Sequence, residues 1–214
     1  DEALSKALER AFKKRGITFS LGVFTEKAEQ SEDGVKVTLA DGTVYEGDYL
    51  LVAVGRGPNT KDLGYEQQGI EMDRGFVLAN KETLETNVPG IYAVGDIVPG
   101  LQLAHRGFQQ GIFVAERIAG QNPAPIVESG IPRITYCEPQ LGSVGLTEKQ
   151  AKEQFGDDGV ETYEYNLGGN GKSQILGTTG FIKLVREKNG PIVGVHMIGA
   201  RTVSYTHLTL PTTP

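Results

Sequence analysis

The chain has 214 residues, of which 38% are hydrophobic and 22% charged, and its formal net charge is −6 at pH 7. This length and composition fit one large or two small globular domains. The acidic balance argues against a nucleic acid or an anionic membrane as a partner, and no apolar run approaches the length that spans a bilayer. A single cysteine cannot form an internal disulfide, which favours a reducing compartment such as the cytoplasm.

The first residues have the pattern of a helix followed at once by a strand. Residues 1–15 predict an amphipathic helix, because Leu4, Leu8 and Phe12 recur on one face. Residues 17–21 follow as a predicted strand. A helix joined directly to a strand is half of a βαβ unit whose first strand is missing, so we expect the chain to begin inside a domain.

The next segment predicts a hairpin and then a buried strand. Two Asp-Gly turn signals, at 33–34 and 41–42, flank an alternating strand pattern over 35–39, which we expect to pair with 43–45. Residues 49–54 are a continuous apolar run. Such a run predicts a buried strand of a parallel sheet.

A short apolar run over 91–94 predicts a further buried strand. It ends at Gly95, where the backbone can approach a ligand closely, and Asp96 follows. Because open α/β sheets bind ligands beyond the carboxyl ends of their strands, Asp96 would stand where a cofactor hydroxyl is received. An isolated Gly-Asp pair is also compatible with an Asp turn that caps the next helix, and the residues alone leave both interpretations open.

A helix is predicted from about Ala104 to Ala119, with Gly120 ending it. Its N-terminus would face the same edge of the sheet as Asp96, and the helix dipole there favours an anionic group. The helical spacing is carried by four apolar residues, Phe108, Ile112, Ala115 and Ala119.

The segment 86–96 closely resembles the second FAD motif of the flavoprotein disulfide reductases. This resemblance implies that Gly95 and Asp96 bind FAD, with Asp96 holding the ribityl chain of the flavin. Residues 100–105 resemble the dihydrolipoyl dehydrogenase branch of that family, in which the matching backbone runs along the flavin. The implied FAD contacts are Gln102, Leu103, Ala104 and His105, and His105 is not the catalytic base of the family.

The segment 55–59 resembles the stretch that closes the NAD domain in the same family. Gly55 is therefore implied to contact the nicotinamide cofactor through its backbone. A plain Gly/Pro turn between domains is the alternative interpretation of this segment, and both can hold together.

Beyond a Pro-containing linker at 121–125, the residues over 132–148 resemble the start of the interface domain of the reductases. A capping box at Thr147 and Gln150 predicts a short helix to Phe155. Strands are predicted over three ranges, the last two joined through Asn189-Gly190: 160–165, 181–185 and 192–198.

The sequence also predicts structural roles for two reactive residue types in this region. Cys137 lies between a strand and a turn with no second cysteine nearby, which favours a structural thiol. His196 alternates with apolar neighbours on a strand, which favours a buried histidine with its hydrogen bonds satisfied over a ligand-binding one.

The fold class implied by the resemblance, which covers residues 1 to about 201, is α/β, with partial Rossmann-like FAD- and NAD-binding domains and an α+β interface (dimerisation) domain. The expected segments are the second half of the NAD domain, the return of the FAD domain, the incomplete interface domain and a Thr/Pro-rich tail that looks non-native: 1–57, 58–122, 123–201 and 202–214.

The resemblance implies FAD and NAD as cofactors and a homodimer formed through 123–201. The implied reaction oxidises protein-bound dihydrolipoamide, with a lipoyl-bearing acyltransferase or other subunits of 2-oxoacid dehydrogenase complexes as partners. The redox cysteine pair and the His/Glu dyad of the family have no counterpart here, so no catalytic residue is assigned and these residues alone are expected to be inactive.

Two alternatives to this function stay open. Gln110 stands where many lipoyl enzymes carry Glu, which leaves room for a related reductase of a low-molecular-weight disulfide. A non-catalytic dimerisation or binding remnant is the alternative from a different class.

Overall fold

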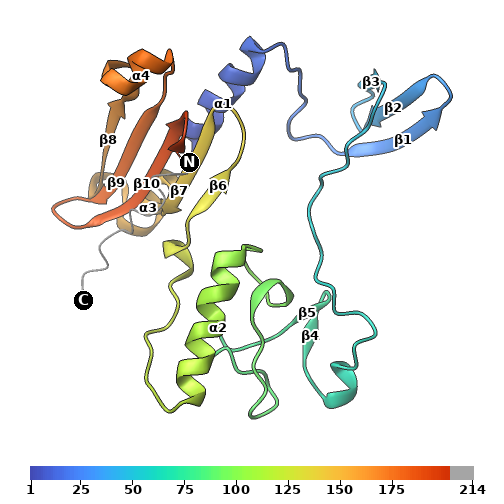
Figure 1. The fold of residues 1–214 in the computed structure, drawn as a ribbon, viewed down its shortest axis with the longest axis vertical. Helices are drawn as coiled ribbons and strands as arrows, with labels where there is room; N and C mark the ends of the chain where they lie inside the picture. Colours follow the sequence, from blue (N-terminus) through green and yellow to red (C-terminus); the bar gives the residue numbers. More distant parts are fainter. Residues whose placement is uncertain (203–214) are drawn as a thin grey trace.

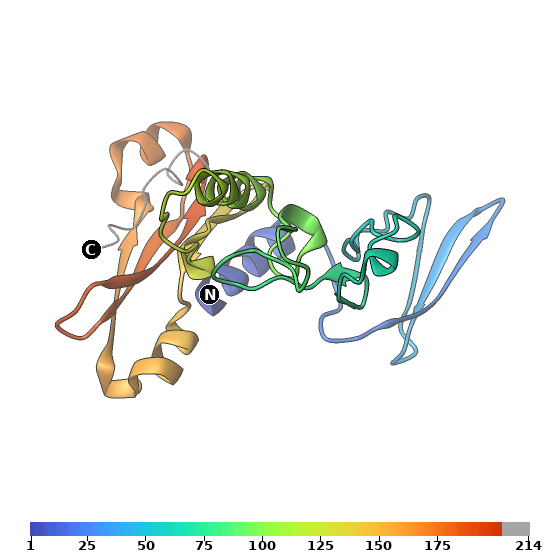
Figure 2. The ribbon, with the colours of Figure 1, turned by 90° about the horizontal axis from the view of Figure 1, so that it is seen from below.

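The computed structural model describes residues 1–202 and groups their elements into three parts (Figure 1). A small three-stranded sheet lies at one end of the molecule and a five-stranded sheet lies at the other (Figure 2). The third part contains helix α2 (Ala104–Ile118) and a short two-stranded ribbon. No helix among residues 1–202 is long and apolar enough to cross a membrane. Most of the predicted tail, 203–214, lies outside the described residues.

The five-stranded sheet is antiparallel throughout, in the order β6-β7-β10-β9-β8. Asn189, with φ of 60°, makes the turn between β9 and β10, so the predicted hairpin is confirmed. The strands are β6 (Arg133–Thr135), β7 (Gln140–Gly145), β8 (Val160–Asn166), β9 (Phe181–Glu187) and β10 (Ile192–Gly199).

Three helices accompany this sheet. Helix α1 (Glu2–Lys14) confirms the first predicted helix and packs on the sheet, where Leu4 is buried against Leu141 and Ile198. Helix α3 (Glu148–Phe155) starts at the predicted capping box, and a further short helix, α4 (Gly171–Leu176), lies between β8 and β9. The sheet therefore has a core made from both ends of the described chain.

The three-stranded sheet is also antiparallel, in the order β1-β2-β3. Val37 faces Tyr45 across β2 and β3, so the predicted pairing of 35–39 with 43–45 is confirmed. The strands are β1 (Thr25–Ser31), β2 (Gly34–Leu39) and β3 (Val44–Gly47).

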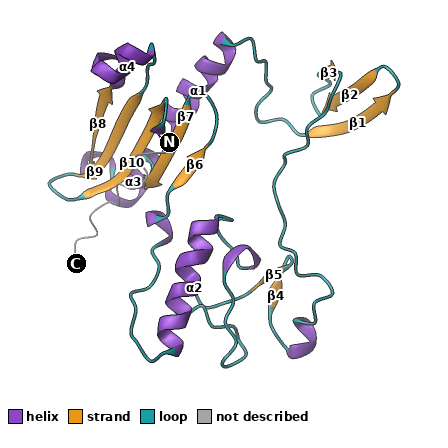
Figure 3. Ribbon diagram, viewed as in Figure 1, coloured by secondary structure: helices purple, strands orange, loops and turns teal. Residues whose placement is uncertain are grey.

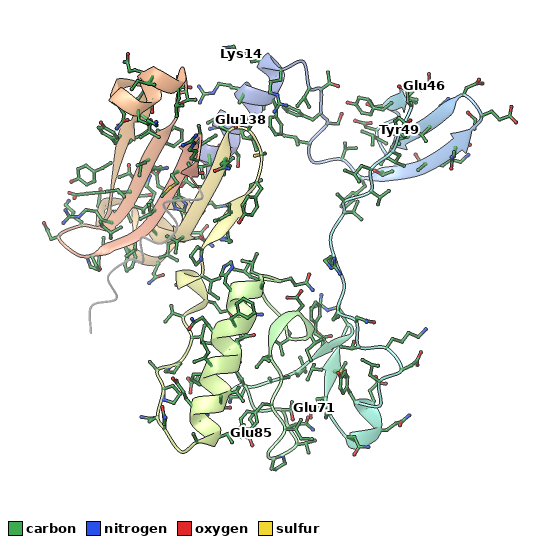
Figure 4. All side chains as sticks on the ribbon, in the orientation of Figure 1. Lys14, Glu46, Tyr49, Glu71, Glu85 and Glu138 are labelled. Atoms are coloured by element: carbon green, nitrogen blue, oxygen red, sulfur yellow. The ribbon has the colours of Figure 1, made fainter. Side chains whose placement is uncertain are left out.

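Two predicted strands do not form. Residues 17–21 and 49–54 run without regular secondary structure, and the second stretch belongs to the long loop between β3 and β4 (Figure 3). Tyr49, labelled in Figure 4, stands at its start and is 95% exposed. Leu51 within it is 89% exposed. A strand needs hydrogen-bonded neighbours, and no strand of residues 1–202 pairs with either stretch. The predictions of strands there were wrong for this reason.

The third part surrounds a small core with little strand structure. Strands β4 (Met72–Asp73) and β5 (Phe76–Val77) pair as a short ribbon. The predicted strand over 91–94 is reduced to one isolated bridge between Tyr92 and Glu85, so that prediction was wrong. Four residues form the core cluster, Ile70, Val77, Ala93 and Val98.

Single turns of 3-10 helix fill the connections between these elements. They are Glu66–Gln68, Gly95–Ile97, Glu128–Gly130, Asp157–Gly159 and Leu167–Gly169.

Helix α2 confirms the helix predicted over 104–119. The apolar face on which that prediction rested, however, is not the face that packs inward. Phe108 and Ile112 on that apolar face are 71% and 52% exposed. The face that packs inward instead carries Arg106, Gln110 and Phe113, which are all buried. The spacing of apolar residues identified the helix, but among the described residues its neighbours contact the polar side.

Candidate functional site

The candidate site is the turn from Gly95 to Ile97, a 3-10 helix that follows extended Val94. Gly95 has φ of 78°, in the left-handed region that favours glycine, and a Cβ there would have no heavy atom within 4 Å. The backbone at Gly95 is thus open to close approach by a ligand. This openness fits the contact with FAD that the resemblance implies.

Asp96 offers a free carboxylate beside that open backbone. Its side chain is exposed and makes no hydrogen bond or ion pair with any residue in the described range 1–202. It caps neither helical element nearby, because Val94 and Leu103 hold the two N-cap positions. The interpretation of Asp96 as a helix cap is therefore wrong, and its oxygens are available to accept hydrogen bonds from a ligand hydroxyl.

The N-terminus of α2 lies next to this turn. Its N-cap residue, Leu103, gives no side-chain hydrogen bond, so the first backbone N–H groups of the helix have no side-chain partner among residues 1–202. The side-chain amide of Gln102 donates to the carbonyl oxygen of Asp96 over 3.4 Å, which joins the turn to the residues before the helix. Unpaired N–H groups and the helix dipole together favour an anionic or polar ligand edge at this place.

Two buried side chains of α2 hold Gly95 from behind. The Oε1 atom of Gln110 accepts from the Gly95 N–H over 2.7 Å, and Arg106 donates to the Gly95 carbonyl oxygen over 3.5 Å. The two residues are 1% and 3% exposed and lie four positions apart, hence on one face of the helix. Both polar groups of the Gly95 backbone are thereby fixed by α2.

Sequence reasoning missed this support. It treated Gln110 only as a departure from the family and did not single out Arg106. The sequence signal was weak, because the spacing of Arg106, Gln110 and Phe113 places them on one face of a helix but only tertiary packing turns that face inward. A polar pair buried in this way needs nearby partners, and here the partner is the turn that carries Asp96.

The predicted FAD contacts are brought together, but the predicted NAD contact is not part of the group. Gln102 to His105 lead from the Asp96 turn into α2, and the ring Nε2 of His105 donates to the carbonyl oxygen of Pro132 over 2.8 Å. The stretch between β3 and β4 runs apart from α2 (Figure 1), and Gly55 lies on it, with φ of 122° and no heavy atom within 4 Å of an added Cβ.

His196 and Cys137 have structural surroundings, as predicted. His196 is fully buried on β10, where its Nε2 donates to the carbonyl oxygen of Leu146 over 2.9 Å and its Nδ1 accepts from the Ser143 hydroxyl. Burial lowers the pKa of His196 to about 4, so the ring is neutral at pH 7.

The Cys137 thiol donates to the carbonyl oxygen of Pro139 over 3.0 Å, and burial raises its pKa, which opposes a reactive thiolate. Within residues 1–202, no group of His, Cys, Asp and Glu side chains is suited to hold a metal ion.

The chain belongs to the pyridine nucleotide-disulphide oxidoreductase family, whose model matches residues 1–111. The dimerisation-domain model of the same family matches residues 131–208, a range that continues past residue 201. The class of protein is therefore established by two matches that together cover most of the chain. They agree with the α/β fold class expected from the sequence.

Several curated relatives carry the name dihydrolipoyl dehydrogenase. The chain is 41% identical over 207 residues to that protein of Bacillus subtilis, with 94% of this chain covered. It is 38% identical over 206 residues to the one of Geobacillus stearothermophilus and 35% identical over 205 residues to the one of Staphylococcus aureus, each with 93% of this chain covered. The chain spans 43% of the length of each of these relatives.

Two solved structures share the fold. LpdA from Mycobacterium tuberculosis superposes with a TM-score of 0.85 at 24% identity, over 96% of this chain and 46% of that one. The HOCl-induced flavoprotein disulfide reductase RclA from Escherichia coli superposes with a TM-score of 0.87 at 21% identity, over 98% of this chain and 47% of that one.

Proposed function

We propose that the complete protein is a dihydrolipoyl dehydrogenase that oxidises protein-bound dihydrolipoamide with FAD and NAD. The observation that carries this proposal is the turn at Gly95 and Asp96, open on its ligand side and fixed by α2 on the other. Identities of 35–41% to dihydrolipoyl dehydrogenases support the choice of substrate within the family.

The residues around this turn fit a flavin cofactor. The Asp96 carboxylate is free to accept hydrogen bonds from the ribityl hydroxyls, and the uncapped start of α2 offers N–H groups to polar edges of the flavin. The backbone from Gln102 to His105 would run along the cofactor, and Gly55 would contact NAD. When bound, FAD supplies the electron transfer between a dithiol and the nicotinamide.

The proposal assigns residues 123–201 to a homodimer interface. The match to a dimerisation domain supports this assignment. Strand β8 lies at the edge of the five-stranded sheet, and its Tyr163 and Tyr165 side chains are 53% and 58% exposed. Aromatic residues are enriched in protein interfaces, which makes this edge suitable for contact with another chain. A lipoyl-bearing acyltransferase of a 2-oxoacid dehydrogenase complex is the further partner, in the cytoplasm.

The proposal gives the dithiol chemistry to residues outside this chain. Cys137 is the single cysteine of the sequence and is engaged with the Pro139 carbonyl. A dithiol–disulfide exchange needs two thiols, so the 214 residues alone should bind or dimerise without turning over substrate.

The test is to express the complete reading frame and measure bound flavin and NAD-linked oxidation of dihydrolipoamide. We expect a yellow dimer that prefers dihydrolipoamide to reduced glutathione. Replacing Asp96 by Asn should weaken FAD binding at least about tenfold, because a hydrogen bond to a charged acceptor is lost. The matched control is Asp33→Asn on the exposed β1–β2 turn, which should bind FAD as the parent does.

Three results would contradict the proposal. A preference for a low-molecular-weight disulfide would favour the related reductase. A colourless dimer without activity would favour a binding module. Equal FAD affinity of the Asp96→Asn variant and the parent would remove Asp96 from the site.

A further inference from the structure

Arg106 is buried deeply for an arginine, since its side chain is 3% exposed, and it has several partners. Its guanidinium donates to the carbonyl oxygens of Pro99 over 2.8 Å and of Gly95 over 3.5 Å. These two carbonyls stand at the two sides of Asp96. One side chain thus spans the segment that carries the candidate flavin carboxylate.

Gly100 shows how closely the guanidinium lies against this segment. A Cβ at Gly100 would stand 2.4 Å from the Nη2 atom of Arg106 and 2.8 Å from its Cζ atom. Real Cβ atoms do not approach other atoms so closely, so any larger residue at Gly100 must displace Arg106. The glycine and the arginine are therefore fitted to each other.

The same guanidinium reaches residues 128–132, the entry segment that leads into the dimerisation domain. Its Nε donates to both carboxylate oxygens of Glu128, over 2.8 and 3.0 Å. Glu128 begins the 3-10 turn before β6, and its side chain is 50% exposed. His105, the neighbour of Arg106, bonds the Pro132 carbonyl of this same entry segment. The first turn of α2 is thus attached to the entry segment by two side chains.

A buried guanidinium needs these partners. A charge removed from water is costly unless it is paired and hydrogen-bonded, and Arg106 is paired with one carboxylate and two carbonyls. Its planar fork can satisfy them together, whereas a lysine ammonium is a single point charge. Loss of Glu128 would leave the buried charge undercompensated and loosen its hold on the two carbonyls.

We propose that Arg106 is a positioning residue for the flavin-binding turn, holding it in register with the entry segment of the dimerisation domain through Glu128. The proposal rests on the proposed function, because it takes the turn at Asp96 as the flavin site. It predicts that FAD affinity depends on Glu128, a residue outside the turn.

The test uses the complete protein, stripped of FAD and titrated with it. Replacing Arg106 by Met should raise the dissociation constant for FAD about tenfold, and Glu128→Gln should raise it about threefold. Arg106→Lys should fall between the parent and Arg106→Met. The double variant should bind no more weakly than Arg106→Met alone, because both changes break one linkage. Arg74→Met, which breaks the exposed pair with Asp73, is the control and should leave FAD affinity unchanged.

A readout without FAD separates positioning from cofactor contact. In the apoprotein, backbone amides over 96–100 should exchange with deuterium faster in Arg106→Met than in the parent. Glu128→Gln should raise the exchange of the same amides by a smaller amount, because the guanidinium stays but loses its carboxylate partner. If Arg106→Met does not fold, Glu128→Gln and Arg106→Lys decide the question.

Unchanged FAD affinity in both Arg106→Met and Glu128→Gln would overturn the positioning role while leaving the proposed function intact. Additive effects of the two changes would overturn the linkage between them. A parent protein that binds no FAD would overturn the proposed function itself.

Discussion

Two stretches of this chain, β9 and the run over 49–54, differ in whether they form a strand and in how exposed their side chains are. Val185 lies on β9 between two neighbouring strands and is fully buried, whereas Leu51 lies on the extended run over 49–54 and is 89% exposed. Both stretches are predicted as strands from their residues, and the run over 49–54 as a buried one. The difference is that β9 has hydrogen-bonded partners within the described chain and the run over 49–54 has none.

An apolar run of residues therefore indicates that a segment can form a buried strand. Whether the strand forms depends on hydrogen-bonded neighbours elsewhere in the fold. Each strand of the five-stranded sheet gains ladder hydrogen bonds, and β7, β9 and β10 also share a core with α1. The run over 49–54 gains neither and exposes its side chains. A long apolar stretch in this condition is suited to pairing with further polypeptide.

The largest expected effect comes from breaking the five-stranded sheet at Gly145. A Cβ there would stand 2.1 Å from the Val193 carbonyl oxygen, on backbone with φ of 80°. Gly145→Ala should destabilise the 214-residue chain by about 4 kcal/mol, from strain and overpacking together. Gly177, after α4, lies in the ordinary left-handed region with φ of 62° and no atom within 4 Å of an added Cβ, so Gly177→Ala should cost only about 1 kcal/mol. Equal losses in chemical denaturation would contradict the close approach of β7 and β10.

The pH dependence of unfolding tests the same sheet through His196. Its folded pKa of about 4 lies below the ordinary value of 6.5. Between these two pH values the unfolded chain therefore binds a proton at His196 that the folded chain does not bind. Stability should be full above pH 6.5 and fall by roughly 3 kcal/mol as the pH drops toward 4. His196→Gln should remove this dependence, whereas His105→Gln should retain it. A parent curve that is flat between pH 6.5 and 4 would contradict the buried neutral ring.

Protonation of Glu148 should cause a second loss of folding stability, at lower pH than that of His196. Hydrogen bonds from Lys152 and Lys183, each 2.6 Å long, lower its pKa to about 2. The stabilisation from this carboxylate is present above the ordinary pKa of 4.5 and is lost as the pH falls toward 2. Glu148→Gln should flatten stability within that acidic window and leave the His196 window unchanged.

A direct contrast of the two stretches uses matched truncations. Val185→Ala should cost roughly 2 kcal/mol, because two buried methyl groups are lost from a packed strand. Leu51→Ala should change the stability of the 214-residue chain by less than about 0.5 kcal/mol, since the side chain is exposed. Similar costs at the two sites would mean that the run over 49–54 is buried in solution.

The smallest effect should arise at the start of α3. The Thr147 hydroxyl accepts from the Gln150 N–H as one half of the capping box. Thr147→Ala should cost about 1 kcal/mol, and Thr147→Ser should cost much less because the hydroxyl is kept. Loss of helix signal without a change in the denaturation midpoint would show that α3 does not support the sheet.

Local patterns predicted local elements well. The helix over 1–15, the capping box at Thr147 and the hairpin at Asn189 depend on neighbours within a few residues, and the structure confirms all three. The strands over 17–21, 49–54 and 91–94 depend on distant partners that periodicity does not specify. Those predictions were wrong because a ladder partner is a property of the whole fold.

The candidate site was predicted only in part, because some of its residues are brought together by contacts between distant parts of the chain. Gly95 and Asp96 were found because a short motif carries them, and their position in the FAD site stays a prediction. The support behind them was missed, because Arg106 meets Pro99, Gly100 and Glu128 only once the helix has packed. A polar residue buried by tertiary contact leaves little trace in a hydrophobic pattern.

The most direct test of the flavin site at the Asp96 turn is amide hydrogen exchange of the complete protein with and without FAD. We expect strong FAD-dependent protection at Asp96 and at the first-turn amides of α2 from Ala104 to Arg106, where the N-cap residue gives no side-chain hydrogen bond. Protection confined to other segments, with these amides unchanged by FAD, would contradict the assignment of this turn as the flavin site.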